Sequence, residues 1–211
     1  MKKSKNIIGT CFIFSGPSGV GKTSLLKSFL KKKILKNIFL SVSYTTRTMR
    51  SNETNKIHYN FVTKKVFKRM IQNNKFLEYA QIFDNYYGTG LNIVKQKLLE
   101  GNDIFFNVDI NGANEIKRKI LFSKSIFILP PSKNEIINRL KKRSKDSNII
   151  IKNRMKKFVT EVKNYKYYDY LIINDSFEKT LKNIKIIIQS EKLKTIYSEK
   201  KYFDLINNLI L

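Results

Sequence analysis

Short apolar runs and amphipathic segments alternate along most of this chain. Runs of this length are typical of strands buried on both faces, and apolar residues at helical spacing are typical of helices packed on one side. The runs predict strands at 11–14, 38–44, 103–110, 125–129 and 170–173. The segments between them predict helices at 22–30, 91–100, from 112 onward, 132–143, 149–163 and 175–191. This alternation predicts an α/β fold in which helices cover both faces of a parallel sheet.

The alternation changes between residues 42 and 90. Short strand patterns at 58–62 and 76–83 flank an amphipathic helix at 63–73, and Asn85-Tyr86-Tyr87-Gly88-Thr89-Gly90 is interpreted as a turn. The pattern predicts three parts. They are a core at 1–41 and 91–190, a small mixed α/β insertion at 42–90, and a C-terminal helical extension at 191–211.

A phosphate-binding loop follows the first predicted strand. Residues 16–23 read Gly-Pro-Ser-Gly-Val-Gly-Lys-Thr, a complete match to G-x-x-x-x-G-K-[ST] placed between a strand and a helix. Glycines let the backbone amides curl around phosphate oxygens, and the helix N-terminus adds unpaired donors and a partial positive charge. Three of the chain's eight glycines stand within these few residues, so a turn without a ligand is the weaker interpretation.

The loop assigns a set of residues to ATP. Lys22 is expected to reach the β- and γ-phosphates, and the Thr23 hydroxyl is expected to ligate a magnesium ion that bridges them. The predicted ATP contacts in this stretch are Gly16, Pro17, Ser18, Gly19, Val20, Gly21, Lys22, Thr23 and Ser24. The loop alone does not choose the acceptor, because NTPases, motors and small-molecule kinases all share it.

The net charge of +26 raises the alternative of nucleic-acid binding. The excess is spread along the chain, mostly as Lys, and is interpreted as a compositional bias without a specific nucleic-acid partner. Only seven of the 42 basic residues are Arg. Arg grips phosphate and carboxylate with a planar fork, so the arginines mark places where that fork is needed. Five of them fall in the segments 47–50 and 139–154.

The chain contains no segment that would direct it to a membrane. No apolar run approaches the roughly 20 residues of a membrane span, and Met1-Lys2-Lys3-Ser4-Lys5 leads into the first predicted strand without a cleavable signal. A cytoplasmic location and no membrane partner are therefore expected. The single cysteine, Cys11, lies in a predicted buried strand and is expected to fill space there.

Six segments, in order, carry a family resemblance. They are Gly-Pro-Ser-Gly-Val-Gly-Lys, Ser-Val-Ser-Tyr-Thr-Thr-Arg-Thr-Met-Arg, Tyr-Asn-Phe, Phe-Leu-Glu-Tyr-Ala-Gln, Asn-Tyr-Tyr-Gly-Thr and Val-Asp-Ile-Asn-Gly. Together they resemble guanylate kinase, a member of the P-loop nucleoside monophosphate kinase superfamily, over roughly residues 7–188. The resemblance implies magnesium-dependent transfer of the ATP γ-phosphoryl group to GMP, giving ADP and GDP. It also implies that 42–90 is a GMP-binding insertion and that a helical lid lies within about 137–156.

The resemblance also implies site residues. The GMP phosphate ligands correspond to Arg47, Arg50, Tyr59 and Tyr87, and the guanine contacts to Ser43, Glu78 and Thr89. Asp109 corresponds to an acidic residue beside the GMP site. Asn174 and Asp175 correspond to an adenine-side pair. The implied catalytic cations are Lys22, Arg47 and three lid arginines, Arg139, Arg143 and Arg154.

Three positions depart from the family pattern. Arg143 stands between Lys142 and Ser144 where the family has Gly-Arg-Gly, which changes the hinge of the lid. Asn107 replaces an acidic residue two positions before Asp109, so a carboxylate that would help to hold magnesium is missing. His58 replaces an Asp, and no role is assigned to it.

Simpler interpretations remain open for individual residues and for the whole chain. Arg47 and Arg50 can belong to a solvated turn, Tyr59 and Tyr87 can be core aromatics, and Asp109 can cap the end of a strand. For the whole chain the alternatives are a guanylate-kinase-like binding module with weak or no activity and a nucleic-acid-associated P-loop NTPase. The intact phosphate loop disfavours the binding module. The sequence leaves monomer and homo-oligomer equally open.

Overall fold

The computed structural model describes residues 9–51, 53–82, 84–143, 148–195, 199 and 202–210, without the side chains of 140, 142–143 and 148–154. A five-stranded sheet forms its centre, and every strand pair in it is parallel. The strand order is β2-β7-β1-β8-β9. The strands are β1 (Cys11–Ser15), β2 (Ile38–Leu40), β7 (Asp103–Asn107), β8 (Lys124–Leu129) and β9 (Tyr170–Ile173). The predicted parallel α/β core is confirmed.

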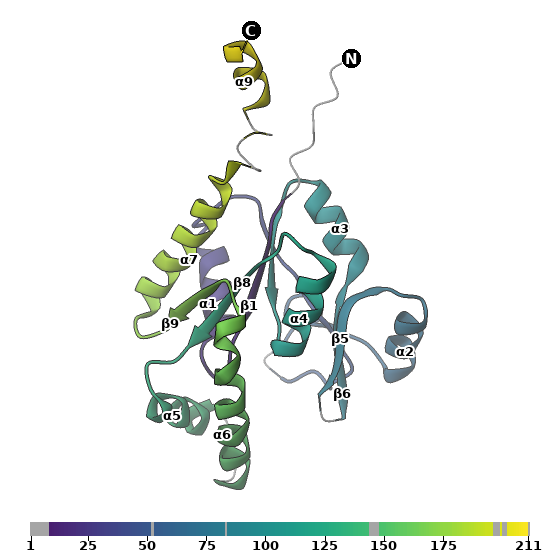
Figure 1. The fold of residues 1–211 in the computed structure, drawn as a ribbon. Helices are drawn as coiled ribbons and strands as arrows, with labels where there is room; N and C mark the ends of the chain where they lie inside the picture. The colour runs from purple at the N-terminus through teal and green to yellow at the C-terminus, as the bar shows by residue number, and fades with distance from the viewer. Residues whose placement is uncertain are drawn as a thin grey trace.

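Side chains of β1 point alternately to two apolar clusters, one on each face of the sheet. Phe12 and Phe14 pack in the cluster that contains α1 (Lys22–Lys31) and α7 (Phe177–Lys192). Cys11 and Ile13 pack in the other, with α3 (Leu91–Leu99) and α4 (Ile110–Lys119). Figure 1 shows these two helix pairs on opposite sides of β1. Burial on both faces explains why the central strands read as continuous apolar runs.

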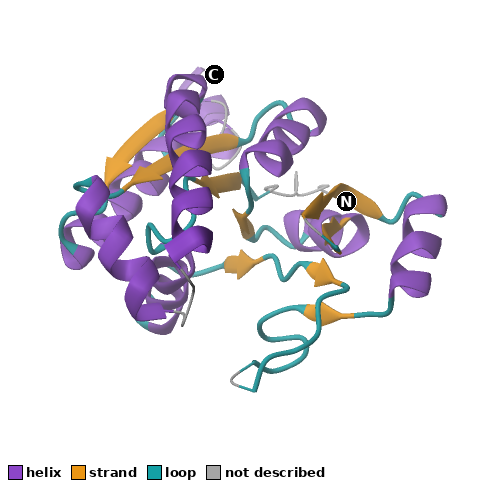
Figure 2. Cartoon of the chain, turned by 90° about the horizontal axis from the view of Figure 1, so that it is seen from below, coloured by secondary structure: helices purple, strands orange, loops and turns teal. Residues whose placement is uncertain are grey.

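A second sheet forms from residues of the predicted insertion. Its order is β4-β3-β6-β5, built from β3 (Tyr44–Thr45), β4 (Asn60–Phe61), β5 (Phe76–Ile82) and β6 (Asn85–Gly90). Helix α2 (Lys64–Gln72) packs on it through Phe67, whose ring stacks on Phe76 at 4.4 Å and on Tyr86 at 5.4 Å between centroids. Figures 1 and 2 show α2 at the outer edge of the molecule.

The structure corrects the expected turn at 85–90, which is strand β6. Its residues pair antiparallel with both β5 and β3. Two glycines suggested a turn, but Gly88 lies in a closely packed part of the sheet. A Cβ at that position would lie 3.0 Å from the Glu78 carbonyl oxygen, the Phe76 ring and Tyr79 Cβ.

Two further boundaries differ from the expectation. The predicted strand at 38–44 is divided, because β2 ends in the central sheet and β3 begins in the second sheet, so the chain crosses between sheets at 41–43. Helix α4 begins before Gly112, at Ile110, because the Asp109 carboxylate caps it by accepting the Gly112 N–H at 2.9 Å.

The remaining helices follow β8. Ser132 caps α5 (Lys133–Arg143) as expected, accepting the Glu135 N–H at 3.1 Å. Helix α6 (Asn148–Val162) continues as a 3-10 turn, η1 (Lys163–Tyr167). In Figure 1, α5 and α6 lie together at the end of the molecule opposite α9 (Phe203–Ile210).

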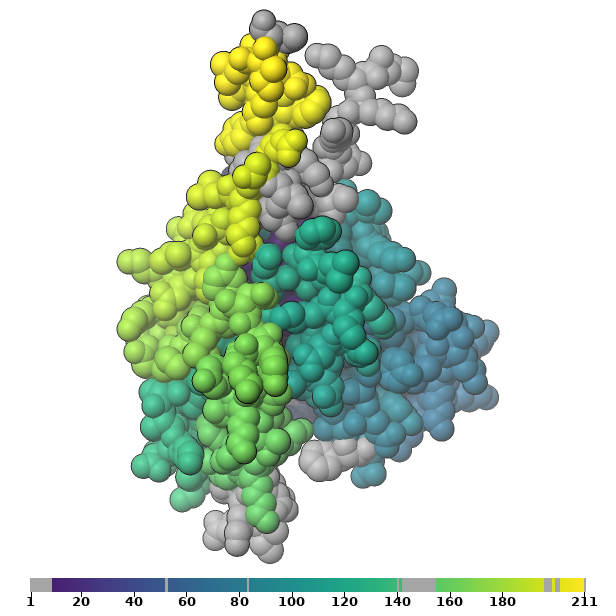
Figure 3. Space-filling model, in the orientation of Figure 1, coloured from purple at the N-terminus to yellow at the C-terminus, as the bar shows by residue number. Residues whose placement is uncertain are grey.

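The C-terminal extension begins inside a helix. Helix α7 ends at Lys192, so the predicted boundary at 190 falls within it. The residues of α9 are exposed, and Figure 3 shows this helix projecting from the body. Within the described ranges, no helix combines the length and the apolar character needed to cross a bilayer.

Candidate active site

The loop after β1 has the geometry of a phosphate cradle. Gly16, Gly19 and Gly21 all have positive φ, at 138°, 88° and 98°. A Cβ on Gly16 would lie 2.2 Å from the Ile128 carbonyl oxygen, so the loop passes β8 at a distance that only glycine permits. Gly21 is the left-handed N-cap of α1, so the loop meets the amino end of that helix.

Lys22 and Thr23 occupy the first turn of α1. The Lys22 ammonium folds over the loop and donates to the carbonyl oxygens of Gly16 at 2.5 Å and Pro17 at 3.1 Å. The exposed Thr23 hydroxyl accepts a hydrogen bond from the Asn107 side-chain amide at 3.0 Å. Asn107 ends β7, so the loop and the end of the neighbouring strand are joined at this hydroxyl.

A cavity of about 520 Å³ opens beside the loop. Asn174 anchors it by donating to the Val20 carbonyl oxygen at 2.8 Å. Arg139 donates to the same carbonyl oxygen at 3.4 Å and to the Glu135 carboxylate at 2.7 Å. The lining residues are Gly19, Gly21, Ser24, Arg139, Asn174, Asp175 and Phe177. The sequence analysis did not anticipate Phe177, and its only sequence signal is its place next to the Asp175-Ser176 cap.

The second sheet carries a cluster of arginine and aromatic side chains. The Arg47 guanidinium lies 5.6 Å from the centre of the Tyr59 ring and 5.7 Å from that of Phe61. The rings of Tyr59 and Tyr87 meet edge to face at 6.0 Å. Burial raises the pKa of the Tyr59 hydroxyl, Tyr87 adds to the shift, and Arg47 opposes it. Three predicted GMP phosphate ligands, Arg47, Tyr59 and Tyr87, are therefore brought together.

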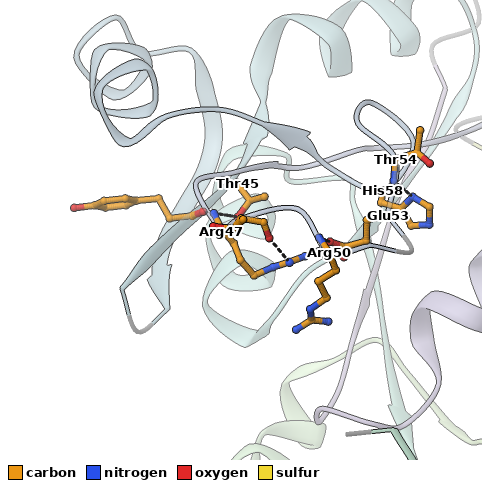
Figure 4. Close-up of polar contacts among 8 residues, drawn as sticks. Thr45, Arg47, Arg50, Glu53, Thr54 and His58 are labelled. Carbon is orange, nitrogen blue, oxygen red and sulfur yellow. Dashed lines mark hydrogen bonds and ion pairs between the residues drawn. The ribbon is translucent and has the colours of Figure 1, made fainter.

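Arg47 is also paired with a carboxylate that the sequence analysis missed. Its Nη2 donates to both oxygens of Glu53, at 2.6 and 2.8 Å. In Figure 4 these two side chains meet, and Arg50 extends away from the pair. The bonds from Arg47 lower the pKa of the Glu53 carboxyl. His58 also has a structural role, because its Nδ1 accepts the Thr54 N–H at 3.0 Å and closes the following turn.

Glu78 lies at the inner end of β5, where β5 packs against α4. Glu78 is only 5% exposed, and one of its carboxylate oxygens accepts a hydrogen bond from the Thr89 hydroxyl at 2.5 Å. The other oxygen would lie 3.0 Å from a Cβ added to Gly112. Burial raises the pKa of the Glu78 carboxyl to about 7. The Thr89 hydrogen bond opposes that shift, and the charge of Asp109 adds to it.

The structure locates the remaining predicted residues as follows. Asp109 caps the N-terminus of α4 rather than the end of a strand, and it also lies close enough to Glu78 to influence the charge of that carboxyl. The Ser43 backbone carbonyl accepts the Asn60 N–H at 2.8 Å. Arg143 and Arg154 belong to α5 and α6, but their side chains lie outside the described residues.

Helix α6 contributes a carboxyl that the sequence did not single out. Burial raises the pKa of the Glu161 carboxyl, and the charges of Lys157 and Lys22 oppose the shift. The influence of Lys22 shows that α6 brings this group toward the phosphate loop. A Glu within a lysine-rich amphipathic helix carries no sequence signal for this position.

The fold and the loop together define the class of protein. The first strand of the parallel sheet leads through a glycine-rich loop into a helix, and an Arg–Tyr cluster lies beside it on a separate small sheet. These features together define a P-loop kinase. A family model for guanylate kinase matches residues 9–191. The chain belongs to the guanylate kinase family.

Relatives and a solved structure agree over nearly the full chain. Guanylate kinase from Buchnera aphidicola subsp. Schizaphis graminum (strain Sg) is 48% identical over 96% of this chain and 98% of the relative. Guanylate kinase from Photorhabdus laumondii subsp. laumondii is 45% identical over 97% and 99%. The crystal structure of guanylate kinase from Anaplasma phagocytophilum matches with a TM-score of 0.75 and 29% identity, covering 90% of this chain and 89% of that chain.

Proposed function

We propose that this chain transfers the γ-phosphoryl group of ATP to GMP, giving ADP and GDP, with Mg²⁺ as the divalent metal. The observation that carries the proposal is the stretch 107–112, which runs from the last residue of β7 into the first turn of α4. At one end Asn107 bonds to Thr23 of the phosphate loop, and at the other Gly112 packs against the Glu78 carboxylate. One short segment thus links a donor-phosphate site to a candidate acceptor site.

On the donor side, the loop amides and Lys22 bind the ATP phosphates, and the cavity beside Asn174 receives the adenine. The Thr23 hydroxyl would supply a neutral oxygen ligand, and Asn107 would supply a second if its amide turned its oxygen, in place of the N–H that it donates, toward Thr23. Such ligands suit Mg²⁺, because it keeps several waters and needs few protein ligands. When bound, Mg²⁺ neutralises charge on the β- and γ-phosphates.

On the acceptor side, Arg47, Arg50, Tyr59 and Tyr87 bind the GMP phosphate. Glu78, when ionised, accepts the N1–H and the exocyclic amino group of guanine together. Ser43 and Thr89 complete the guanine contacts, and Asp109 holds α4 against this site. Adenine has no N1 proton and no amino group at C2, so it would leave the buried carboxylate unpaired.

The transfer itself needs alignment and charge stabilisation more than covalent chemistry. A GMP phosphate oxygen attacks the γ-phosphorus, the bond to the ADP oxygen breaks, and charge spreads over the equatorial oxygens. Lys22 stabilises that charge. Arg139 from α5, with Arg143 and Arg154, supplies further cations when the lid at 137–156 closes. Closure also excludes water, which would otherwise accept the phosphoryl group.

The substrates set the remaining expectations. Both substrates, ATP and GMP, are small molecules, and we propose no specific nucleic-acid partner. We also propose a cytoplasmic location and the insertion at 42–90 as the GMP-binding part. A coupled ADP-release assay with GMP, with AMP, without acceptor and with polynucleotide tests the function. ADP release that requires GMP supports it. Nucleotide binding without turnover would indicate a binding module, and stimulation by polynucleotide would indicate a nucleic-acid-associated NTPase.

Replacing Arg50 by Lys is expected to raise the KM for GMP about tenfold or more and to leave the KM for ATP within about twofold. Lysine keeps the charge but loses the planar fork. Steady-state kinetics with each nucleotide varied measures this. Arg69→Lys is the matched control, because Arg69 is exposed in the last turn of α2. Equal effects on both nucleotides would show that Arg50 is not an acceptor ligand.

Replacing Asn107 by Asp is expected to lower, severalfold, the Mg²⁺ concentration needed for ATP binding. The substitution puts a charged oxygen ligand beside the Thr23 hydroxyl, and affinity for divalent cations rises with ligand charge. Calorimetric titration of ATP at several Mg²⁺ concentrations measures it without turnover. Asn111→Asp adds the same charge at an exposed position of α4 and serves as the control. An unchanged Mg²⁺ requirement would remove Asn107 from the metal site.

A further inference from the structure

Arg47 and Glu53 form an ion pair in the connection between β3 and β4 of the second sheet. Both carboxylate oxygens accept from Arg47 Nη2, at 2.6 and 2.8 Å. The side chains are only 17% and 11% exposed, so the pair is largely removed from solvent. Removing either partner would leave the other charge without its bonded partner in this shielded position.

Glu53 also fixes the backbone between the two arginines. One of its oxygens accepts the Arg50 N–H at 2.9 Å, so a single carboxylate holds the Arg47 side chain and the Arg50 backbone. Arg47 is held on its other sides by the Thr48 carbonyl oxygen at 2.7 Å and by the rings of Tyr59 and Phe61. Among the described residues, the Arg50 guanidinium has no such partner, and Figure 4 shows it extending away from the pair.

We infer that Glu53 is a positioning residue for the acceptor phosphate: it holds Arg47 and the turn to Arg50 in the arrangement that binds GMP. The inference rests on the proposed function. A guanidinium has five N–H groups, and its three bonds to Thr48 and Glu53 leave two for a phosphate oxygen. Arg47 can therefore bind phosphate without releasing Glu53. Because the Arg47 side chain is already ordered in the free protein, GMP binding costs less conformational entropy.

A different role would give the opposite result. If the Glu53 carboxylate instead lay where the GMP phosphate binds Arg47, GMP would have to displace that carboxylate. Removing the Glu53 charge would then tighten GMP binding. The geometry favours positioning, because displacement would free a carboxylate that is 11% exposed and still bonded to the Arg50 backbone. The sign of the change in GMP affinity separates these roles.

The experiment compares wild type, Glu53→Gln and Glu53→Asp. Glutamine keeps the size and can still accept the Arg50 N–H, but it loses the charge that holds Arg47. We expect Glu53→Gln to raise the KM and the calorimetric Kd for GMP about tenfold, with the KM for ATP within about twofold and a smaller change in kcat. Aspartate is expected to recover part of the GMP affinity. Unchanged or tighter GMP binding by Glu53→Gln overturns the inference.

A double-mutant cycle tests whether Glu53 acts through Arg47. In an Arg47→Ala background, Glu53→Gln is expected to change the Kd for GMP less than twofold, and a full additional tenfold loss contradicts the inference. Glu100→Gln, at an exposed position after α3, is the control, and thermal unfolding checks that each variant is folded. Wild-type turnover with GMP tests the proposed function separately, so a wild type without kinase activity and a neutral Glu53→Gln are different failures.

Discussion

Replacing Lys22 by Met is expected to lower kcat by about 10³-fold or more while leaving the fold intact. Its ammonium already lies over the loop, bonded to the carbonyl oxygens of Gly16 and Pro17. Those carbonyls are weak partners compared with phosphate, so the cation can turn to the γ-phosphoryl group when ATP binds. Methionine keeps most of the apolar length of the side chain and removes only the charge and its donors.

The measurement is kcat for GMP phosphorylation at saturating ATP, together with thermal unfolding of the variant. Lys27→Met is the matched control, because Lys27 lies on the exposed side of the same helix and its loss removes the same charge. It is expected to retain kcat within about twofold. A folded Lys22→Met protein with near-normal turnover would show that the Lys22 ammonium does not stabilise the transferring phosphoryl group.

The core was predictable because its strands and phosphate loop depend on residues that are adjacent in the sequence. Parallel strands buried on both faces are mostly apolar, and a loop that curls around phosphate needs glycine, so the sequence alone indicates a strand at 11–14 and a phosphate loop at 16–23. The second sheet was harder to predict. Strand β6 contains two glycines, and nothing local distinguishes a glycine packed closely against β5 from a glycine required by a turn. The sheet to which 44–45 belongs depends on long-range pairing.

The site shows the same division between local and long-range information. The family motifs led to Arg47, Tyr59 and Tyr87, which the structure brings together. Glu53 was missed, although one signal was present: it is the only acidic residue between 42 and 77, in a segment that carries two arginines. A lone carboxylate near paired arginines is a candidate partner. The distances that make it one come from the turn at 48–53, and the sequence pattern does not specify that turn.

Replacing Glu78 by Gln is expected to lower kcat/KM for GMP by about 10³- to 10⁴-fold and to shrink the preference for GMP over AMP. The amide oxygen can still accept the Thr89 hydroxyl, which lies 2.5 Å from the carboxylate in the wild type. It cannot accept both guanine donors, and its own N–H groups face them. The KM for ATP is expected to stay within a few-fold, because the phosphate loop is on the other sheet.

The same substitution has a pH signature. The pKa of Glu78 is about 7 in the unliganded protein, mainly because of burial, while guanine needs the ionised form. Wild-type kcat/KM for GMP is therefore expected to fall, relative to Glu78→Gln, by about tenfold for each pH unit below 7. Dividing wild-type by variant values at each pH removes the titration of the GMP phosphate itself. A ratio that is flat from pH 5 to 8 would mean that the ionised Glu78 carboxylate does not recognise guanine.

Without nucleotide, the effect of the Glu78 charge on folding stability is expected to be opposite to its effect on GMP turnover, because ionisation destabilises the folded protein. Because the folded-state pKa of Glu78, about 7, lies above the ordinary value of 4.5, the stability contributed by the protonated carboxyl is present below pH 4.5 and lost as the pH rises through 7. Glutamine stays neutral, so at pH 8 the variant is expected to exceed the wild type by on the order of 3 kcal/mol in free energy of unfolding, and by little at pH 4.5. Urea unfolding at the two pH values measures this, with Glu100→Gln as an exposed control. A variant less stable than the wild type at pH 8 would show that the Glu78 charge supports the fold, whereas greater stability with lost GMP turnover identifies a carboxylate retained for its substrate.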